Sequence, residues 1–102
     1  MHIEFLRSGG FAGISLTAKL DLQNLSTDES AILEKQINES NFFDLQELIK
    51  SAAPMPDGFE YQLTISSLER THTVTVSESL ITAQLRPLID HLTDLARTGK
   101  YR

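Results

Sequence analysis

Hydrophobic and polar residues alternate in four stretches of the chain, and this alternation predicts four half-buried strands. The clearest stretch is 14–22, where every second residue is apolar and the residues between them are Ser, Thr, Lys and Asp. Residues 2–7, 59–65 and 72–76 follow the same period. The first two stretches flank a short glycine-rich segment and the last two flank the turn at 66–70. We therefore expect two antiparallel hairpins.

A helix is expected after the first hairpin. Ser26 is placed to cap its N-terminus, and Glu29 follows three residues later, as in a capping box. This helix should run to about Glu39. Residues 41–50 are predicted to form a short second helical piece.

The end of the chain carries the strongest helical pattern, with leucines and isoleucine recurring at helical spacing over 85–96. Pro87 suits the first turn and Gly99 suits the position after the last. The element order is thus β-β-α-α-β-β-α. It predicts an α+β fold of two layers, with a four-stranded antiparallel sheet and about three helices packed on one face. At 102 residues, we expect a single domain over 1–102.

Composition narrows the classes of partner. The chain has 9 Lys and Arg against 14 Asp and Glu, and this net charge of −5 argues against nucleic acid. It has no cysteine, so disulfides and thiolate metal sites are excluded. No signal-like start and no long apolar run is visible, so we expect a cytoplasmic protein without a membrane partner.

Two segments have the composition of loops. Arg7-Ser8-Gly9-Gly10-Phe11-Ala12-Gly13-Ile14 holds three glycines around an aromatic residue, and residues 51–58 hold two prolines followed by Asp57-Gly58. Phe11 on such a loop has few neighbours to pack against, although it can also fold back over the sheet edge. Pro56-Asp57-Gly58 alone reads as ordinary turn chemistry.

Several segments of the chain resemble the emfourin family, the protealysin-associated inhibitors of thermolysin-like zinc metalloproteases. They follow in collinear order over nearly the whole chain. They are the N-terminal thirteen residues, then Asn41-Phe42-Phe43-Asp44-Leu45, Asp57-Gly58-Phe59-Glu60-Tyr61, Arg70-Thr71-His72-Thr73-Val74 and Leu85-Arg86-Pro87-Leu88.

The resemblance implies an inhibitor and not an enzyme, without a cofactor or metal of its own. Its partner would be a thermolysin-like protease, whose zinc keeps one position open for water. A blocker of such a site needs a carboxylate for the zinc and an apolar side chain for the specificity pocket. We assign these roles to Asp57 and Phe11, on loops 51–58 and 8–13 that should lie at the same end of the domain. The predicted partner-binding residues are Gly9, Gly10, Phe11, Ala12, Pro54, Met55, Pro56, Asp57 and Gly58.

Other interpretations stay open at this point. Asp28 or Glu29 could supply the carboxylate instead, although capping accounts for both and they should lie at the opposite end of the first hairpin. A protein-interaction module with a non-protease partner is the alternative function, using the same loops or the corner at Phe42-Phe43, where at least one ring should be core. No local catalytic signature is present, and the three histidines lack the spacing of a metal site. His72 is expected to be a strand residue with a satisfied nitrogen.

Overall fold

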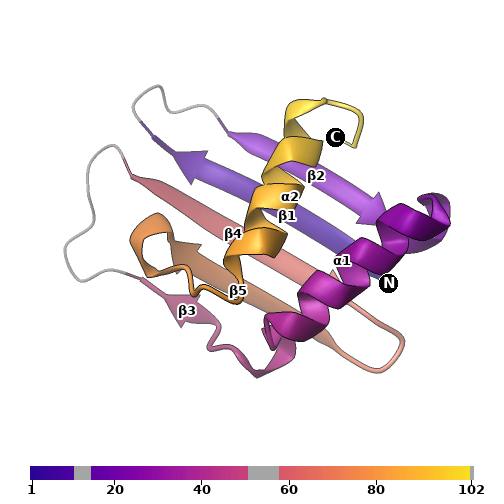
Figure 1. Cartoon of the computed structure of the whole chain (residues 1–102). Helices are drawn as coiled ribbons and strands as arrows, with labels where there is room; N and C mark the ends of the chain where they lie inside the picture. Colours follow the sequence, from indigo (N-terminus) through magenta and orange to yellow (C-terminus); the bar gives the residue numbers. More distant parts are fainter. Residues whose placement is uncertain (11–14, 51–57, 102) are drawn as a thin grey trace.

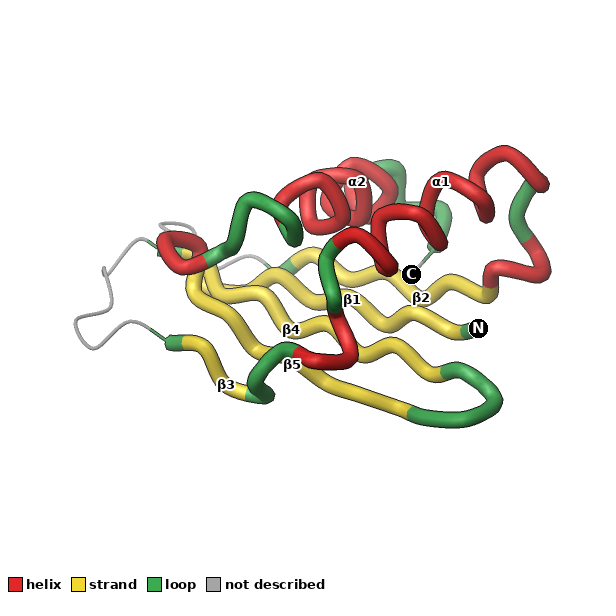
Figure 2. Tube along the Cα trace, turned by 60° about the horizontal axis from the view of Figure 1, so that its bottom comes forward, coloured by secondary structure: helices red, strands yellow, loops and turns green. Residues whose placement is uncertain are grey.

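The computed structural model describes residues 1–10, 15–50 and 58–101. In this part of the chain a five-stranded sheet is covered on one face by two α-helices (Figures 1 and 2). The order across the sheet is β2-β1-β4-β5-β3. The strands are β1 (His2–Gly9), β2 (Leu16–Asp21), β3 (Leu48–Ile49), β4 (Phe59–Ser66) and β5 (Thr71–Ser77).

The two predicted hairpins are confirmed. β1 pairs antiparallel with β2, and β4 pairs antiparallel with β5. The hairpins are joined through β1 and β4, which also pair antiparallel over the full length of β1. This pairing puts Gly9 opposite Phe59 at one end of the sheet and His2 opposite Ser66 at the other.

The helices are α1 (Thr27–Glu39) and α2 (Arg86–Arg97). Ser26 caps α1 as predicted, because its hydroxyl oxygen accepts a hydrogen bond of 3.2 Å from the amide of Glu29. After α2, Gly99 adopts a φ of 71°, and its amide donates to the carbonyl of Ala96. The start of α1 and the end of α2 were therefore predicted correctly from the sequence.

The prediction for residues 41–50 was wrong. The segment forms a single 3-10 turn at Phe42–Asp44 and then the two-residue strand β3, which pairs parallel with β5. Asn41 has a left-handed φ of 54°, which ends the helical course, and buried Phe42 then fixes the chain against the core. In the described residues the sheet is consequently mixed and five-stranded, with two α-helices instead of about three.

The core lies between the sheet and the helices. Each long strand buries alternate side chains, and both helices contribute one apolar stripe. Ile3, Leu33, Ile65, Leu88, Ile89 and Leu92 are completely buried. Among the described residues, neither helix is long and apolar enough to cross a bilayer.

Candidate functional site

Three of the predicted binding residues are described, and they lie together. Gly9 is the last residue of β1, Gly10 directly follows it, and Gly58 directly precedes β4. The amide of Gly10 donates a hydrogen bond of 3.2 Å to the carbonyl oxygen of Gly58. The residue just before segment 11–14 and the residue just after segment 51–57 are therefore in direct contact. The other predicted residues, Phe11, Ala12, Pro54, Met55, Pro56 and Asp57, lie outside the described part of the chain.

Gly9 and Gly10 are required by the geometry of this junction. Their φ angles are 85° and 79°, in the region that favours glycine. A Cβ atom at Gly9 would lie 2.7 Å from the carbonyl oxygen of Gly58, and one at Gly10 would lie 2.4 Å from Cε1 of Phe59. A side chain at either position would thus be strained by the backbone conformation, and it would collide with the Gly58 backbone at position 9 or require the Phe59 ring to shift at position 10.

Arg7 and Phe59 add a second contact at the same junction. The guanidinium carbon of Arg7 lies 4.2 Å from the centroid of the Phe59 ring, which is a cation–π distance. Arg7 follows Ile3 and Phe5 on the core face of β1, so a charged group stands where the alternation calls for an apolar one. That break in the pattern was the signal that sequence reasoning missed.

Tyr61 and Glu78 extend the junction toward α2. Tyr61 lies opposite Arg7 in the sheet and is only 4% exposed. Burial of its hydroxyl, and to a lesser extent the nearby Glu78 carboxylate, raises the pKa of Tyr61, while Arg7 opposes the shift.

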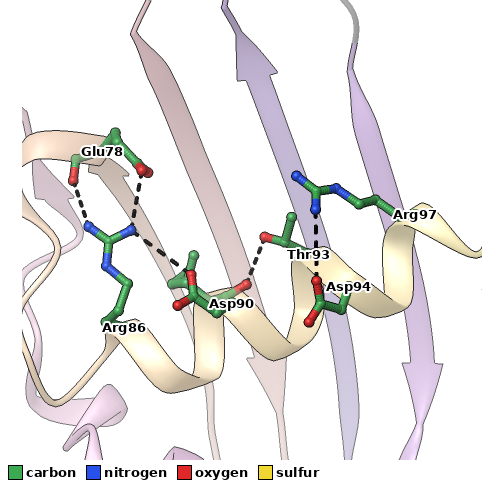
Figure 3. Close-up of polar contacts among 7 residues, drawn as sticks. Glu78, Arg86, Asp90, Thr93, Asp94 and Arg97 are labelled. Atoms are coloured by element: carbon green, nitrogen blue, oxygen red, sulfur yellow. Dashed lines mark hydrogen bonds and ion pairs between the residues drawn. The ribbon is translucent and has the colours of Figure 1, made fainter.

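The carboxylate of Glu78 is held by Arg86 in the first turn of α2. The guanidinium donates to Oε1 of Glu78 at 3.2 Å and to its backbone carbonyl at 3.3 Å (Figure 3). Arg86 also lies 4.0 Å from the carboxylate of Asp90, one turn along the helix. The start of α2 is in this way attached to the end of β5, beside the junction of β1 and β4.

A further ion pair spans the two flanks of segment 51–57. The ammonium of Lys50, just before it, lies 3.2 Å from the carboxylate of Glu60, two residues beyond Gly58. Both side chains are substantially exposed, so the pair contributes little to stability. Its short distance shows that the two flanks of the segment lie at the same end of the sheet.

The alternative carboxylates, Asp28 and Glu29, lie at the opposite end of the first hairpin, as expected. β2 ends at Asp21, which pairs with His2, and α1 begins shortly afterwards (Figure 1). The capping box is only half formed, because the Glu29 carboxylate lies 2.8 Å from Nε2 of His91.

The remaining candidate groups have structural roles. Nε2 of His72 lies 2.7 Å from the carbonyl oxygen of Leu45, so this nitrogen is satisfied as predicted. Phe42 is buried and Phe43 is partly exposed, with the guanidinium of Arg70 at 4.0 Å from its ring. Within residues 1–10, 15–50 and 58–101, no group of three or more acidic or histidine side chains could hold a metal ion.

Comparison with known proteins identifies the family. The sequence model of the emfourin family matches residues 5–93. The chain is also similar to a solved structure from Serratia proteamaculans, described as emfourin (M4in), an M4 family peptidase inhibitor. That similarity has 20% identity and a TM-score of 0.44, and covers 99% of this chain and 89% of the other. No curated protein sequence matches this chain significantly. The match over most of its length means that the chain belongs to the emfourin family.

Proposed function

We propose that this protein inhibits a thermolysin-like zinc metalloprotease of the M4 family by occluding the active-site cleft with segments 8–13 and 51–58. Membership of the emfourin family supports the inhibitory role. The observation that carries the mechanism is the hydrogen bond between Gly10 and Gly58, because it joins the flanks of both segments at one end of the sheet. Two segments that start from one junction can enter one cleft together.

The chemistry of the target defines what the two segments must supply. A thermolysin-like protease holds zinc with two His and one Glu, and a water molecule occupies the open position. In this proposal the carboxylate of Asp57 displaces that water, and Phe11 enters the hydrophobic specificity pocket. Met55 adds apolar contact through its adaptable side chain, and Pro54 and Pro56 lower the entropic cost of ordering the segment. The protein would act in the cytoplasm.

The proposal is tested by titrating a purified M4 protease with the full chain and measuring peptide hydrolysis. We expect stoichiometric loss of activity, with the inhibitor recovered intact by mass spectrometry. A small zinc-binding inhibitor of the protease should compete with the chain, because both would occupy the same cleft. A serine protease serves as the control and should keep its activity.

Two results would overturn the proposal. Full protease activity at a large molar excess of the chain would exclude inhibition. Binding without any loss of hydrolysis would instead support an interaction module with a non-catalytic target surface.

A further inference from the structure

We infer that Arg7, Gly10 and Phe59 are positioning residues that hold the end of β1 against the start of β4, where one segment assigned to the protease cleft begins and the other ends. Arg7 and Phe59 are not among the residues predicted to contact the protease, and Gly10 takes this role in addition to its predicted contact. The inference rests on the proposed function, because the coupled segments are those assigned to the protease cleft. It names residues outside the tips of the loops whose change should weaken inhibition.

The first step of the argument is the closeness of the two backbones. Gly10 donates to the carbonyl of Gly58 at 3.2 Å, and Gly9 lies opposite Phe59 in the ladder between β1 and β4. The space for a Cβ atom at Gly10 is already filled by the Phe59 ring, at 2.4 Å. A side chain at position 10 therefore requires the Phe59 ring to shift from its place in the junction.

The second step is the contact that holds the ring in place. Phe59 contacts the Arg7 guanidinium at 4.2 Å from its centroid while it also fills the space beside Gly10. Arg7 lies in β1 and Gly10 directly follows that strand, just before segment 11–14, whereas Phe59 begins β4, which follows segment 51–57. We therefore expect a change in any of the three residues to alter the junction at which segment 11–14 begins and segment 51–57 ends.

The third step is that the chain contains a matched contact without this role. The guanidinium of Arg70 lies 4.0 Å from the ring centroid of Phe43, almost the same geometry as the pair of Arg7 and Phe59. Arg70 is the last residue of the turn between β4 and β5, at the end of the sheet where His2 lies. Loss of that contact leaves the junction of Gly10 and Gly58 untouched.

The experiment compares Arg7→Met with Arg70→Met in the full chain. Both substitutions remove the guanidinium, and with it a cation–π contact, but keep an unbranched apolar side chain at the position. We expect Arg7→Met to raise the inhibition constant about three- to tenfold and Arg70→Met to leave it within about twofold, at similar melting temperatures. Equal inhibition constants for the two variants would overturn the positioning role.

Glycine variants provide an independent pair. Gly10→Ala and Gly99→Ala each place an alanine at a positive φ, at 79° and 71°, but only Gly10 lies at the junction. We expect Gly10→Ala to weaken inhibition by at least about tenfold, whereas Gly99→Ala lowers the melting temperature and inhibits normally. If Gly10→Ala folds and inhibits like the parent, the inference is wrong.

A measurement without protease separates this inference from the proposed function. In amide NMR spectra, Arg7→Met should shift the resonances of Gly58 and Phe59 and accelerate exchange of the Gly10 amide. Arg70→Met should leave all three unchanged. Unperturbed Gly10 and Gly58 amides in Arg7→Met would refute the coupling even if the parent protein inhibits. Perturbed amides in a protein that does not inhibit would refute the proposed function alone.

Discussion

The amide of Gly10 and the carbonyl oxygen of Gly58 are hydrogen-bonded at 3.2 Å, although Gly10 follows β1 of the first hairpin and Gly58 precedes β4 of the second. This contact holds the start of segment 11–14 next to the end of segment 51–57. It also makes the central seam of the sheet, between β1 and β4, the part of the fold on which presentation of the proposed site depends.

Asp57→Asn tests the role of the proposed zinc ligand. Asparagine suits a Pro-x-Gly turn as well as aspartate does, but it is a much poorer ligand for zinc. We expect normal folding and an inhibition constant at least about tenfold higher, measured by protease titration. Asp28→Asn is the matched control and should inhibit like the parent. The reverse ranking of the two variants would transfer the role to the start of α1.

Phe11→Ala tests the apolar anchor. Loss of one aromatic side chain from an interface should cost about 1.5 to 3 kcal/mol of binding free energy, with little change in melting temperature. Leu68, which is fully exposed in the turn between β4 and β5, provides the control, because Leu68→Ala should alter neither quantity. A lower melting temperature with unchanged inhibition would mean that Phe11 packs against the domain itself.

Folding should be independent of metal. The hydrophobic pattern is complete, and the described residues offer no cluster of metal ligands. Addition of EDTA to the free protein should leave its Tm unchanged in differential scanning calorimetry. A decrease of several degrees would reveal a structural metal and a different role for the histidines.

Stability at high pH should report on Tyr61, whose pKa is raised chiefly by burial. Above about pH 10 the unfolded chain ionises its tyrosines, whereas the folded chain retains the proton on Tyr61. The free energy of unfolding therefore falls as the pH rises through this range. The Tm of Tyr61→Phe should fall less steeply than that of the parent between about pH 9.5 and 11.5. Parallel curves would contradict this assignment.

Two adjacent residues of α1 test the packing of the helix layer. Leu33 is completely buried, whereas Ile32 is 48% exposed. Leu33→Ala should lower the free energy of unfolding by about 2 to 5 kcal/mol, and Ile32→Ala by less than about 1 kcal/mol. Urea denaturation monitored by circular dichroism measures both. Similar losses for the two variants would show that α1 packs differently on the sheet.

The elements that the sequence predicted correctly are those with a local signal. Alternation located the four long strands, and Ser26 and Gly99 marked helix ends, because each signal depends only on neighbouring residues. β3 has just two residues, too few for any period, and it is a strand only because β5 offers it an unpaired edge. Secondary structure imposed by a distant partner leaves no trace in local patterns.

In the candidate site, too, only the features with a local signal were predicted. The glycine-rich composition alone marked Gly9 and Gly10 as part of a loop, since few other residues tolerate the positive φ that both adopt. The partners Arg7 and Phe59 were not predicted, because their contact depends on the register between β1 and β4. That register is fixed by side chains far apart in the chain, and spacing within either strand does not reveal it.

The seam between β1 and β4 has a consequence for how the inhibitor is made. Each hairpin can form from nearby residues alone, but the seam closes a long stretch of chain and belongs to the slower, non-local steps of folding. During synthesis the first hairpin leaves the ribosome before β4 exists, so a nascent chain lacks Gly58 beside Gly10. The proposed activity then appears only with completed folding. A synthetic peptide copied from either hairpin would lack the half of the junction that the other hairpin supplies.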